Sequence, residues 1–282
     1  MKQLVVVSGK GGTGKTTLVG AFASLAENKI IADCDVDAPD LHLILSPEIK
    51  EKYEFRGSKE ATLDTSKCIN CGECEKYCRF EAIKNLEINS FKCEGCGVCK
   101  LICPAGAITL KEKTAGYWFV SDTKFGKLVH AQLNIGEENS GKLASAVRQK
   151  ARELAEDKEY IIIDGPPGIG CPVIASIGGT NLALIVTEPT LSAIHDMKRI
   201  LEVANHFRVK AVVCINKYDI NTELSNEIEK YCMENNISIV GRISFNNIVT
   251  KAMADGKSVM DYSKEKVSDE IKAVWEKCKE LL

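Results

Sequence analysis

The sequence lacks the features that mark membrane-spanning, secreted or nucleic-acid-binding chains. No apolar run approaches the roughly eighteen residues that a membrane span needs. The net charge of −2 leaves no broad basic field for nucleic acid or an anionic membrane. The first apolar run soon ends in glycine, without the charged start, long apolar segment and cleavage site of a signal peptide. These absences predict a cytoplasmic protein with no nucleic-acid partner and no membrane association.

Cysteine, in contrast, is abundant, with 13 residues in a chain of 282. In a reducing compartment so many cysteines indicate metal or cluster ligands before disulfides. The chain is long enough for one large domain with a small insert.

Short apolar runs alternate with helical patterns along most of the chain. Strands are expected at 2–7, 29–32, 160–163, 182–186, 211–215 and 237–240. Helices are expected at 16–27, 140–156, 191–207, 223–235 and 268–281. This alternation predicts a doubly wound α/β fold with a mostly parallel sheet covered on both faces. The last helix is charge-balanced, so its apolar face is expected to cover the core rather than a membrane.

The middle of the chain breaks this rhythm. From about 62 to 110 the apolar runs vanish and eight cysteines appear, and the runs 117–121 and 127–133 then form an expected β-hairpin. The sequence therefore predicts a P-loop domain of residues 1–60 and 113–282, with a small inserted α+β domain at 61–112. About fifty residues bury too little apolar surface to fold alone, so bound metal should supply folding energy.

A glycine-rich loop follows the first strand and opens the first helix, and it fits the pattern G-x-x-x-x-G-K-[ST]. Backbone N–H groups of such a loop surround phosphate oxygens, and the helix N-terminus adds partial positive charge. Lys15 is expected to reach the β- and γ-phosphates, and the Thr16 hydroxyl to coordinate Mg²⁺. The predicted nucleotide-binding residues of this segment are Gly9, Lys10, Gly11, Gly12, Thr13, Gly14, Lys15, Thr16 and Thr17.

Besides Lys15 the loop contains an additional lysine, Lys10, just after its first glycine. With it the loop resembles the K-G-G-x-G-K-[ST] loop of the MinD, ParA, Mrp and nitrogenase iron-protein superfamily. The resemblance implies that Lys10 acts in trans on the partner's phosphates in an ATP-bound dimer. It also implies that Asp35 orients the attacking water and that Asp164 holds the Mg²⁺ shell, with Thr16 and Asp35 as further Mg²⁺ ligands. The Gly165–Gly168 stretch is then switch II, expected to be a turn that responds to the γ-phosphate.

A polar segment, Asn216–Asp219, follows a later strand and fits the N-K-x-D signature that reads guanine in GTPases. In the MinD-like family an asparagine at this place contacts adenine, so Asn216 and Lys217 are assigned to the nucleotide. The loop with two lysines favours ATP, and GTP stays open as the alternative.

Two cysteine motifs of the same spacing, C-x2-C-x2-C-x3-C, lie 25 residues apart. This is the run of bacterial two-cluster ferredoxins, in which the fourth cysteine ligates the other cluster. One [4Fe–4S] cluster is therefore assigned to Cys68, Cys71, Cys74 and Cys103. The second [4Fe–4S] cluster is assigned to Cys93, Cys96, Cys99 and Cys78. A zinc site is the alternative, although zinc favours C-x2-C pairs over this asymmetric order.

Among the other cysteines, Cys171 lies seven residues after Asp164, much as a cluster cysteine of the nitrogenase iron protein follows its Walker B aspartate. A structural role and a cluster bridging two subunits both stay open for it.

Three functions agree with these patterns. ATP binding and dimerisation could gate electron transfer from the clusters to a redox partner, which is the main prediction. The alternatives are a cluster assembly or delivery ATPase with a cluster-accepting partner, and a MinD-like positioning ATPase with structural or sensory clusters. In each case the ATP-bound form is expected to be a homodimer or a heterodimer with a related ATPase.

Overall fold

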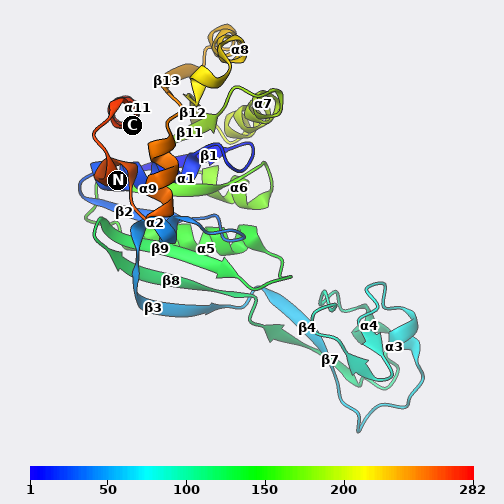
Figure 1. Cartoon of the computed structure of the whole chain (residues 1–282). Helices are drawn as coiled ribbons and strands as arrows, with labels where there is room; N and C mark the ends of the chain where they lie inside the picture. The colour runs from blue at the N-terminus through cyan, green and yellow to red at the C-terminus, as the bar shows by residue number, and fades with distance from the viewer. The chain divides into compact units, whose positions relative to one another are not determined.

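The computed structural model describes all residues, 1–282, and the chain divides into two compact units (Figure 1). The P-loop unit comprises Met1–Tyr53, Trp118–Gln132 and Ser140–Leu282. The cysteine unit comprises Glu54–Tyr117 and Leu133–Asn139, and so contains the predicted insert and extends beyond it at both ends. Within it, β4 (Ser58–Leu63) pairs antiparallel with β7 (Ile108–Lys113), across the bounds predicted for the insert.

The large sheet has nine strands in the order β13-β12-β11-β1-β10-β2-β9-β8-β3. Every pair from β13 to β9 is parallel. This confirms the predicted α/β fold with its mostly parallel sheet, and each predicted strand is present. The strands are β1 (Lys2–Ser8), β2 (Lys29–Asp33), β3 (Glu48–Phe55), β8 (Gly116–Thr123), β9 (Gly126–Leu133), β10 (Tyr160–Pro167), β11 (Leu182–Thr187), β12 (Lys210–Asn216) and β13 (Ser238–Ile243).

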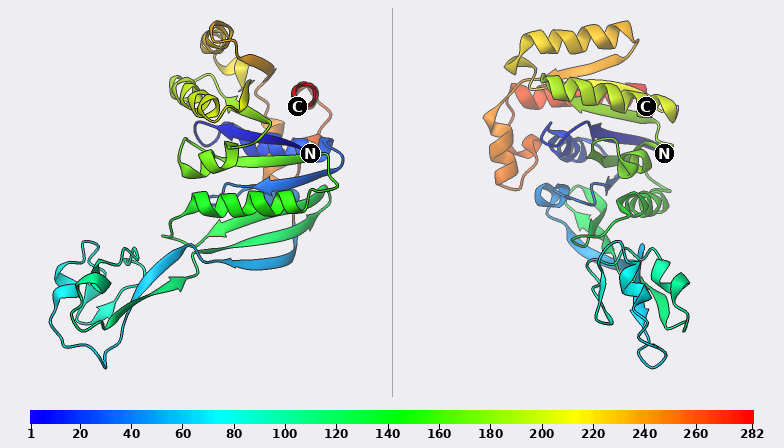
Figure 2. Two further views of the ribbon diagram at one scale, coloured as in Figure 1. Left: turned by 180° about the vertical axis from the view of Figure 1, so that it is seen from behind. Right: turned by 90° about the vertical axis from the view of Figure 1, so that its right-hand side faces the viewer.

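Helices cover both faces of this sheet (Figure 2). One face packs against α1 (Lys15–Leu25), which also contacts α10 (Val259–Tyr262) and α11 (Lys266–Leu281). The other helices of the unit are α2 (Leu41–Leu45), α5 (Ser140–Glu153), α6 (Cys171–Ile177), α7 (Leu191–His206), α8 (Thr222–Glu234) and α9 (Asn247–Ala254), with a 3₁₀ turn at Tyr218–Ile220. The predicted helices are all present, with ends that differ by up to three residues.

The C-terminal helix α11 lies against the core. Trp275 is almost fully buried, and its ring lies 5.2 Å from that of Phe22 on α1. Ile271, Val274 and Cys278 are buried beside it. The prediction that α11 covers the core is confirmed, because its apolar face is already occupied. None of the helices has both the length and the apolar character that crossing a membrane requires.

The predicted hairpin is formed by β8 and β9, which are neighbours in the sheet and are joined by two residues. His130 of β9 is buried and lies 2.9 Å from the Ser121 hydroxyl of β8 through its Nε2 atom. Its ring stacks on that of Phe119 of β8, with centroids 5.0 Å apart. Burial, together with the charge of His42, lowers the pKa of His130 to about 4.

This shift makes a prediction for stability. An unfolded histidine titrates near pH 6.5, so the unfolded chain takes up this proton first as the pH falls. The stability contributed by neutral His130 is present above about pH 6.5 and is lost towards pH 4, by about 3 kcal/mol in total. Urea unfolding of wild type and His130→Gln at several pH values isolates this contribution. The difference in unfolding free energy between the two proteins should change by about 2–3 kcal/mol across that range, and a constant difference would contradict the assignment.

The cysteine unit has little regular structure. Besides β4 and β7 it contains the pair β5 (Ile83–Lys84) and β6 (Glu87–Ile88), and two short helices, α3 (Glu73–Lys76) and α4 (Val98–Ile102). Its motif cysteines are partly or fully exposed, and few of its apolar side chains are buried. The unit therefore has only a small apolar core to stabilise it.

Candidate functional site

The glycine-rich loop runs from the end of β1 into α1, as predicted. Gly14 caps the helix in the left-handed conformation, with φ of 91°. A Cβ atom there would lie 2.2 Å from Nδ2 of Asn216, so only glycine fits. No side chain caps α1 and no acidic residue lies in its first turn. Its first backbone N–H groups therefore face the loop and suit an anion such as phosphate.

Lys15 projects into a group of carboxylates at the carboxyl ends of β2 and β10. Its ammonium bonds the carboxylate of Asp164, lies 3.7 Å from Oδ2 of Asp35, and donates to the Thr16 hydroxyl at 3.2 Å. Asp33 and Asp164 are register partners on the adjacent strands β2 and β10. The structure thus brings together the four residues predicted to handle phosphate and Mg²⁺, namely Lys15, Thr16, Asp35 and Asp164.

Burial decides the electrostatics of this group. It raises the pKa of Asp33 well above the usual range, and the charge of Asp164 adds to the effect. It raises the pKa of Asp35 to about 6, although Lys15 opposes the shift. Burial also opposes the charge of Lys15, but Asp164 and its neighbours outweigh burial and the pKa of Lys15 is raised. Lys15 thus lies among carboxylates whose negative charge is disfavoured by burial and by one another.

The loop and Asp35 border one cavity of about 300 Å³. Its lining includes Gly11–Thr17, Asp35 and, from α9, Met253. Two buried oxygens in this region have no hydrogen-bond partner, namely Oγ1 of Thr13 and Oδ2 of Asp33. Buried oxygens without partners are rare in proteins, and Thr13 lines the cavity, where a phosphate group would supply its missing contact. The cavity therefore suits the phosphate groups of a nucleoside triphosphate.

The predicted switch II turn is wrong in its extent. Residues Gly165–Pro167 continue strand β10 instead of turning, because Ser8 pairs with Pro167 and its carbonyl accepts from the N–H of Gly168 at 2.9 Å. The chain turns only at Gly168, where φ is 93°.

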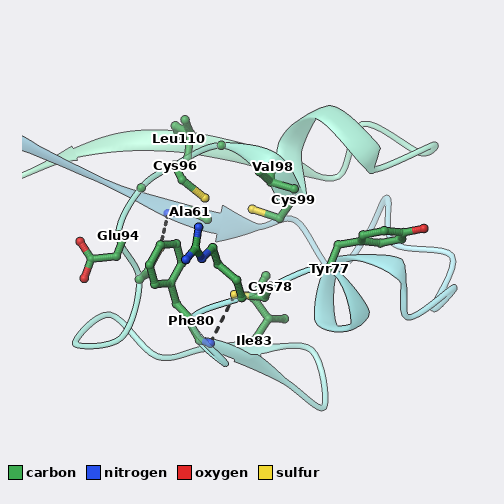
Figure 3. A pocket seen from close by; sticks show the side chains of 15 residues that line it. Ala61, Tyr77, Cys78, Phe80, Ile83, Glu94, Cys96, Val98, Cys99 and Leu110 are labelled. Carbon is green, nitrogen blue, oxygen red and sulfur yellow. Dashed lines mark hydrogen bonds between the residues drawn. The ribbon is translucent and has the colours of Figure 1, made fainter.

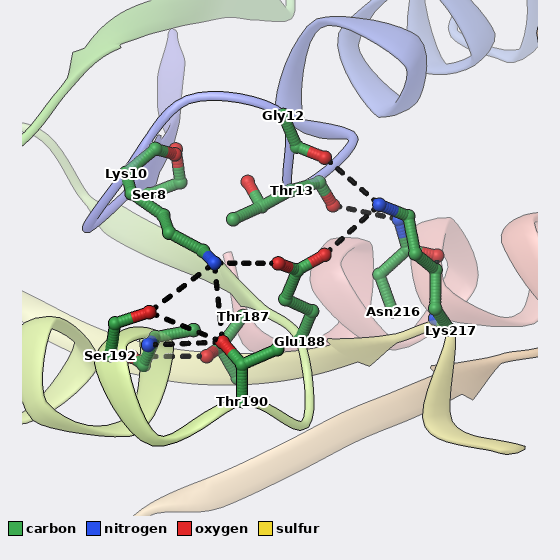
Figure 4. Close-up of polar contacts among 11 residues, drawn as sticks. Ser8, Lys10, Gly12, Thr13, Thr187, Glu188, Thr190, Ser192, Asn216 and Lys217 are labelled. Carbon is green, nitrogen blue, oxygen red and sulfur yellow. Dashed lines mark hydrogen bonds and ion pairs between the residues drawn. The ribbon is translucent and has the colours of Figure 1, made fainter. Parts of the chain in front are cut away.

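Lys10 does not line this cavity; its side chain points to the segment that follows β11 (Figure 4). Its ammonium lies 2.8 Å from Oε1 of Glu188 and donates to Thr190 at 3.2 Å and to Ser192 at 3.4 Å. These three residues follow β11 and begin α7, and none of them was predicted. A signal was present, since polar residues directly after a parallel strand share the sheet edge with the P-loop.

Asn216 and Lys217 hold the loop from β12. Asn216 donates to the carbonyl of Thr13 at 2.7 Å, and Lys217 donates to that of Gly12 at 3.0 Å. Asp219 accepts from the backbone N–H of Phe245 at 2.7 Å. In a guanine-reading N-K-x-D motif, the aspartate presents its carboxylate to the base. Here one oxygen of the corresponding Asp219 carboxylate is bonded to the backbone instead.

In the cysteine unit, sulfurs from both motif copies line one cavity (Figure 3). They belong to Cys78, Cys93, Cys96 and Cys99, and Ala61, Ile83 and Leu110 complete an apolar wall around them. Burial raises the pKa of Cys99, and the proximity of the other three thiols adds to the shift. The fourth cysteine of the first motif therefore lies with the first three of the second.

Backbone amides point at the motif sulfurs. The N–H groups of Ala61 and Ala82 donate to Cys93 and Cys78, each at 3.4 Å. The N–H groups of Ala107 and Asn70 donate to Cys103 and Cys68, at 3.3 and 3.5 Å. Such donors stabilise thiolates and tune iron–sulfur centres. In the first motif, burial raises the pKa of Cys74, with Cys68 and Cys71 nearby.

No group of three or more His, Cys, Asp or Glu side chains is arranged to hold a single metal ion. The cluster ligands therefore stay predictions. Of the remaining cysteines, Cys34, Cys214, Cys232 and Cys278 are buried, whereas Cys171 is exposed at the start of α6.

Comparison with known proteins agrees with this geometry. The sequence model of the CobQ/CobB/MinD/ParA nucleotide binding domain matches residues 4–259. An uncharacterized protein of Methanocaldococcus jannaschii is 35% identical, over 99% of this chain and 97% of its own length. The septum site-determining protein MinD of Bacillus subtilis is 23% identical, over 94% of this chain and 84% of its own length.

Solved structures share the fold. MinD from Pyrococcus horikoshii, solved with Mg-ADP, superposes with a TM-score of 0.63 at 15% identity and covers 99% of this chain and 96% of its own. The MinC:MinD complex of Aquifex aeolicus gives a TM-score of 0.59 at 18% identity, with 99% and 96% covered.

Proposed function

Because this chain belongs to the CobQ/CobB/MinD/ParA nucleotide-binding family and is a P-loop ATPase of the MinD/ParA type, we propose that ATP binding joins two subunits. We further propose that this ATP-dependent dimerisation acts on an iron–sulfur unit carried by the same chain. The observation that carries the first part is the convergence of Lys15, Thr16 and Asp35 on one cavity bordered by the glycine-rich loop, with Asp164 paired to Lys15. The second part rests on the cavity lined by four cysteine sulfurs.

The residues of the P-loop unit have separate roles in this proposal. Bound ATP and Mg²⁺ supply the reactive phosphoanhydride and the charge that polarises it. Lys15 and the N–H groups at the start of α1 neutralise the phosphates. Thr16, Asp35 and Asp164 orient the hydrated ion, and Asp35 is placed to accept a proton from the attacking water. Adenine is the preferred base, because the MinD structure from Pyrococcus horikoshii was solved with Mg-ADP.

For the cysteine unit we propose two [4Fe–4S] clusters with exchanged fourth ligands. Cys78 would hold the cluster of Cys93, Cys96 and Cys99, and Cys103 would hold that of Cys68, Cys71 and Cys74. Support comes from the cavity shared by the first four sulfurs, from its apolar wall and from the N–H donors aimed at four motif sulfurs. This chemistry suits a cubane better than a zinc ion, for which a tetrahedral set of close ligands is usual.

The comparisons favour a MinD-like positioning ATPase over an electron-transfer protein as the physiological role. The characterised relatives named above are septum site-determining proteins, and one of them is solved with a partner protein, MinC. In this chain the clusters would then be structural or sensory. Gating of electron transfer to a redox partner, and delivery of a cluster to an acceptor, are second candidates that rest on the cysteine unit alone. Measuring the cluster reduction potential with and without ATP distinguishes them, since only gated transfer requires the potential to depend on nucleotide.

Replacing Lys10 by alanine tests the proposed dimer. The variant is expected to bind Mg-ATP about as tightly as wild type, because Lys10 contacts Glu188, Thr190 and Ser192 instead of the cavity. Its ATP turnover should fall at least about tenfold, since a charged group that stabilises the transferring phosphate from the partner would be lost. Calorimetry measures the binding and phosphate release measures the turnover. Lys272→Ala on the exposed face of α11 serves as the control, and unchanged turnover in Lys10→Ala would refute the action in trans.

A further inference from the structure

Glu188 connects two lysines of the nucleotide site (Figure 4). It directly follows β11, and its side chain is only 15% exposed. One carboxylate oxygen lies 2.8 Å from the Lys10 ammonium and the other lies 2.9 Å from that of Lys217. Burial pushes the pKa of Glu188 up, but the bonds from the two lysines outweigh it and hold the pKa below its usual value. Glu188 is thus ionised and shared between two cations.

The contacts of Lys10 satisfy its whole ammonium group. A lysine ammonium has three N–H donors. Lys10 has three acceptors, namely Glu188, Thr190 and Ser192, and all three belong to its own subunit. In this arrangement Lys10 has no donor left for a phosphate of a partner subunit.

We propose that Glu188 is a positioning residue that holds Lys10 within its own subunit and so sets how tightly two ATP-bound subunits associate. The inference rests on the proposed function, in which Lys10 acts in trans. Before Lys10 reaches the partner's phosphate it must leave Glu188. The smaller the fraction of subunits in which Lys10 is released, the lower is the affinity of the dimer.

Lys217 makes this release possible without leaving a buried charge unpaired. When Lys10 departs, Glu188 keeps its contact with Lys217, which also bonds the carbonyl of Gly12. The carboxylate then has one cation in place of two. Because the Lys10 side chain is 32% exposed, its pair with Glu188 is of moderate strength, and we expect it to weaken the dimer by about fivefold.

The test measures the dimer dissociation constant by analytical ultracentrifugation at saturating Mg²⁺ and AMPPNP, a non-hydrolysable ATP analogue. Glu188→Gln should dimerise about fivefold more tightly than wild type. Glu188→Asp, which keeps the charge but has one methylene less, should give an intermediate value. Glu227→Gln removes the same charge from the exposed face of α8 and should match wild type. Thermal unfolding of each variant confirms that it is folded.

A double-mutant cycle identifies the group through which Glu188 acts. In a Lys10→Ala background, Glu188→Gln should leave the dissociation constant unchanged. If wild type dimerises but Glu188→Gln is equal to it or weaker, or if the effect persists without Lys10, the inference about Glu188 is overturned and the proposed function stands. A wild-type chain that stays monomeric at saturating AMPPNP overturns the proposed function and this inference together.

Discussion

Lys15→Ala is expected to lower the affinity for Mg-ATP by about 100-fold or more. Lys15 is buried, lines the cavity, and pairs with Asp35 and Asp164. Removing one partner of a buried, hydrogen-bonded charge pair costs about 2–5 kcal/mol, and about 2.7 kcal/mol corresponds to 100-fold. The loss has two sources, since the phosphates lose a cation and the carboxylates then repel them. Titration with a fluorescent ATP analogue in the presence of Mg²⁺ measures the affinity.

The control for this variant must separate binding from folding. Lys272→Ala removes a lysine of α11 that is exposed, so its affinity and its unfolding temperature should equal those of wild type. Lys15→Ala itself is expected to stay folded, because Asp33 and Asp164 already have raised pKa values and take up protons when their cation is lost. If Lys15→Ala is folded and its affinity lies within about threefold of wild type, the P-loop assignment is contradicted. A tenfold change in affinity corresponds to about 1.4 kcal/mol of binding free energy, so a threefold change is too small for a lost phosphate contact.

The sequence predicted best those features that are formed by residues contiguous in the chain. The apolar runs that became β1, β10 and β11 are buried on both faces, so few alternatives to a central parallel strand existed for them. The phosphate loop was predicted for the same reason, since the glycines, Lys15 and Thr16 are contiguous. Asp35 and Asp164 lie far apart in sequence, but Asp35 follows β2 and Asp164 lies in the C-terminal half of β10, and parallel strands bring these parts to one edge of the sheet.

Features that depend on contacts between distant side chains were not predicted. No periodicity indicates that Glu188 meets Lys10, because the pair depends on the positions of β1 and β11 in the sheet. The strands β4 and β7 were not predicted either. Their residues are mostly charged or small, and the pairing joins segments on both sides of the cysteine motifs. The end of β10 was wrong because two prolines suggested a turn, whereas Ser8 continues the pairing as far as Pro167.

Replacing cysteines in pairs is expected to give the largest changes in iron and sulfide content, because each double variant removes either one cluster or both clusters. Anaerobically prepared wild type should contain about eight iron atoms and eight sulfides per chain, as two [4Fe–4S] clusters require. Exchange of the fourth ligands predicts that Cys78 acts with Cys99 and not with Cys74, because the sulfurs of Cys78 and Cys99 share one cavity. Cys78→Ala with Cys99→Ala should therefore remove one cluster and leave about four iron atoms.

Cys78→Ala with Cys74→Ala should instead disrupt both clusters and leave almost no iron, although each pair removes the same number of thiols. Without exchange of the fourth ligands, the two results would be reversed, so iron and sulfide analysis decides between the two ligand sets. Cys171→Ala is the matched control, because that cysteine is exposed and lies outside the cysteine unit. A full iron content in this control also argues against a cluster bridging two subunits. Zinc in place of iron in the wild-type protein would overturn the iron–sulfur proposal. It would leave the assignment of the nucleotide site intact, since none of the residues of that site is a cysteine.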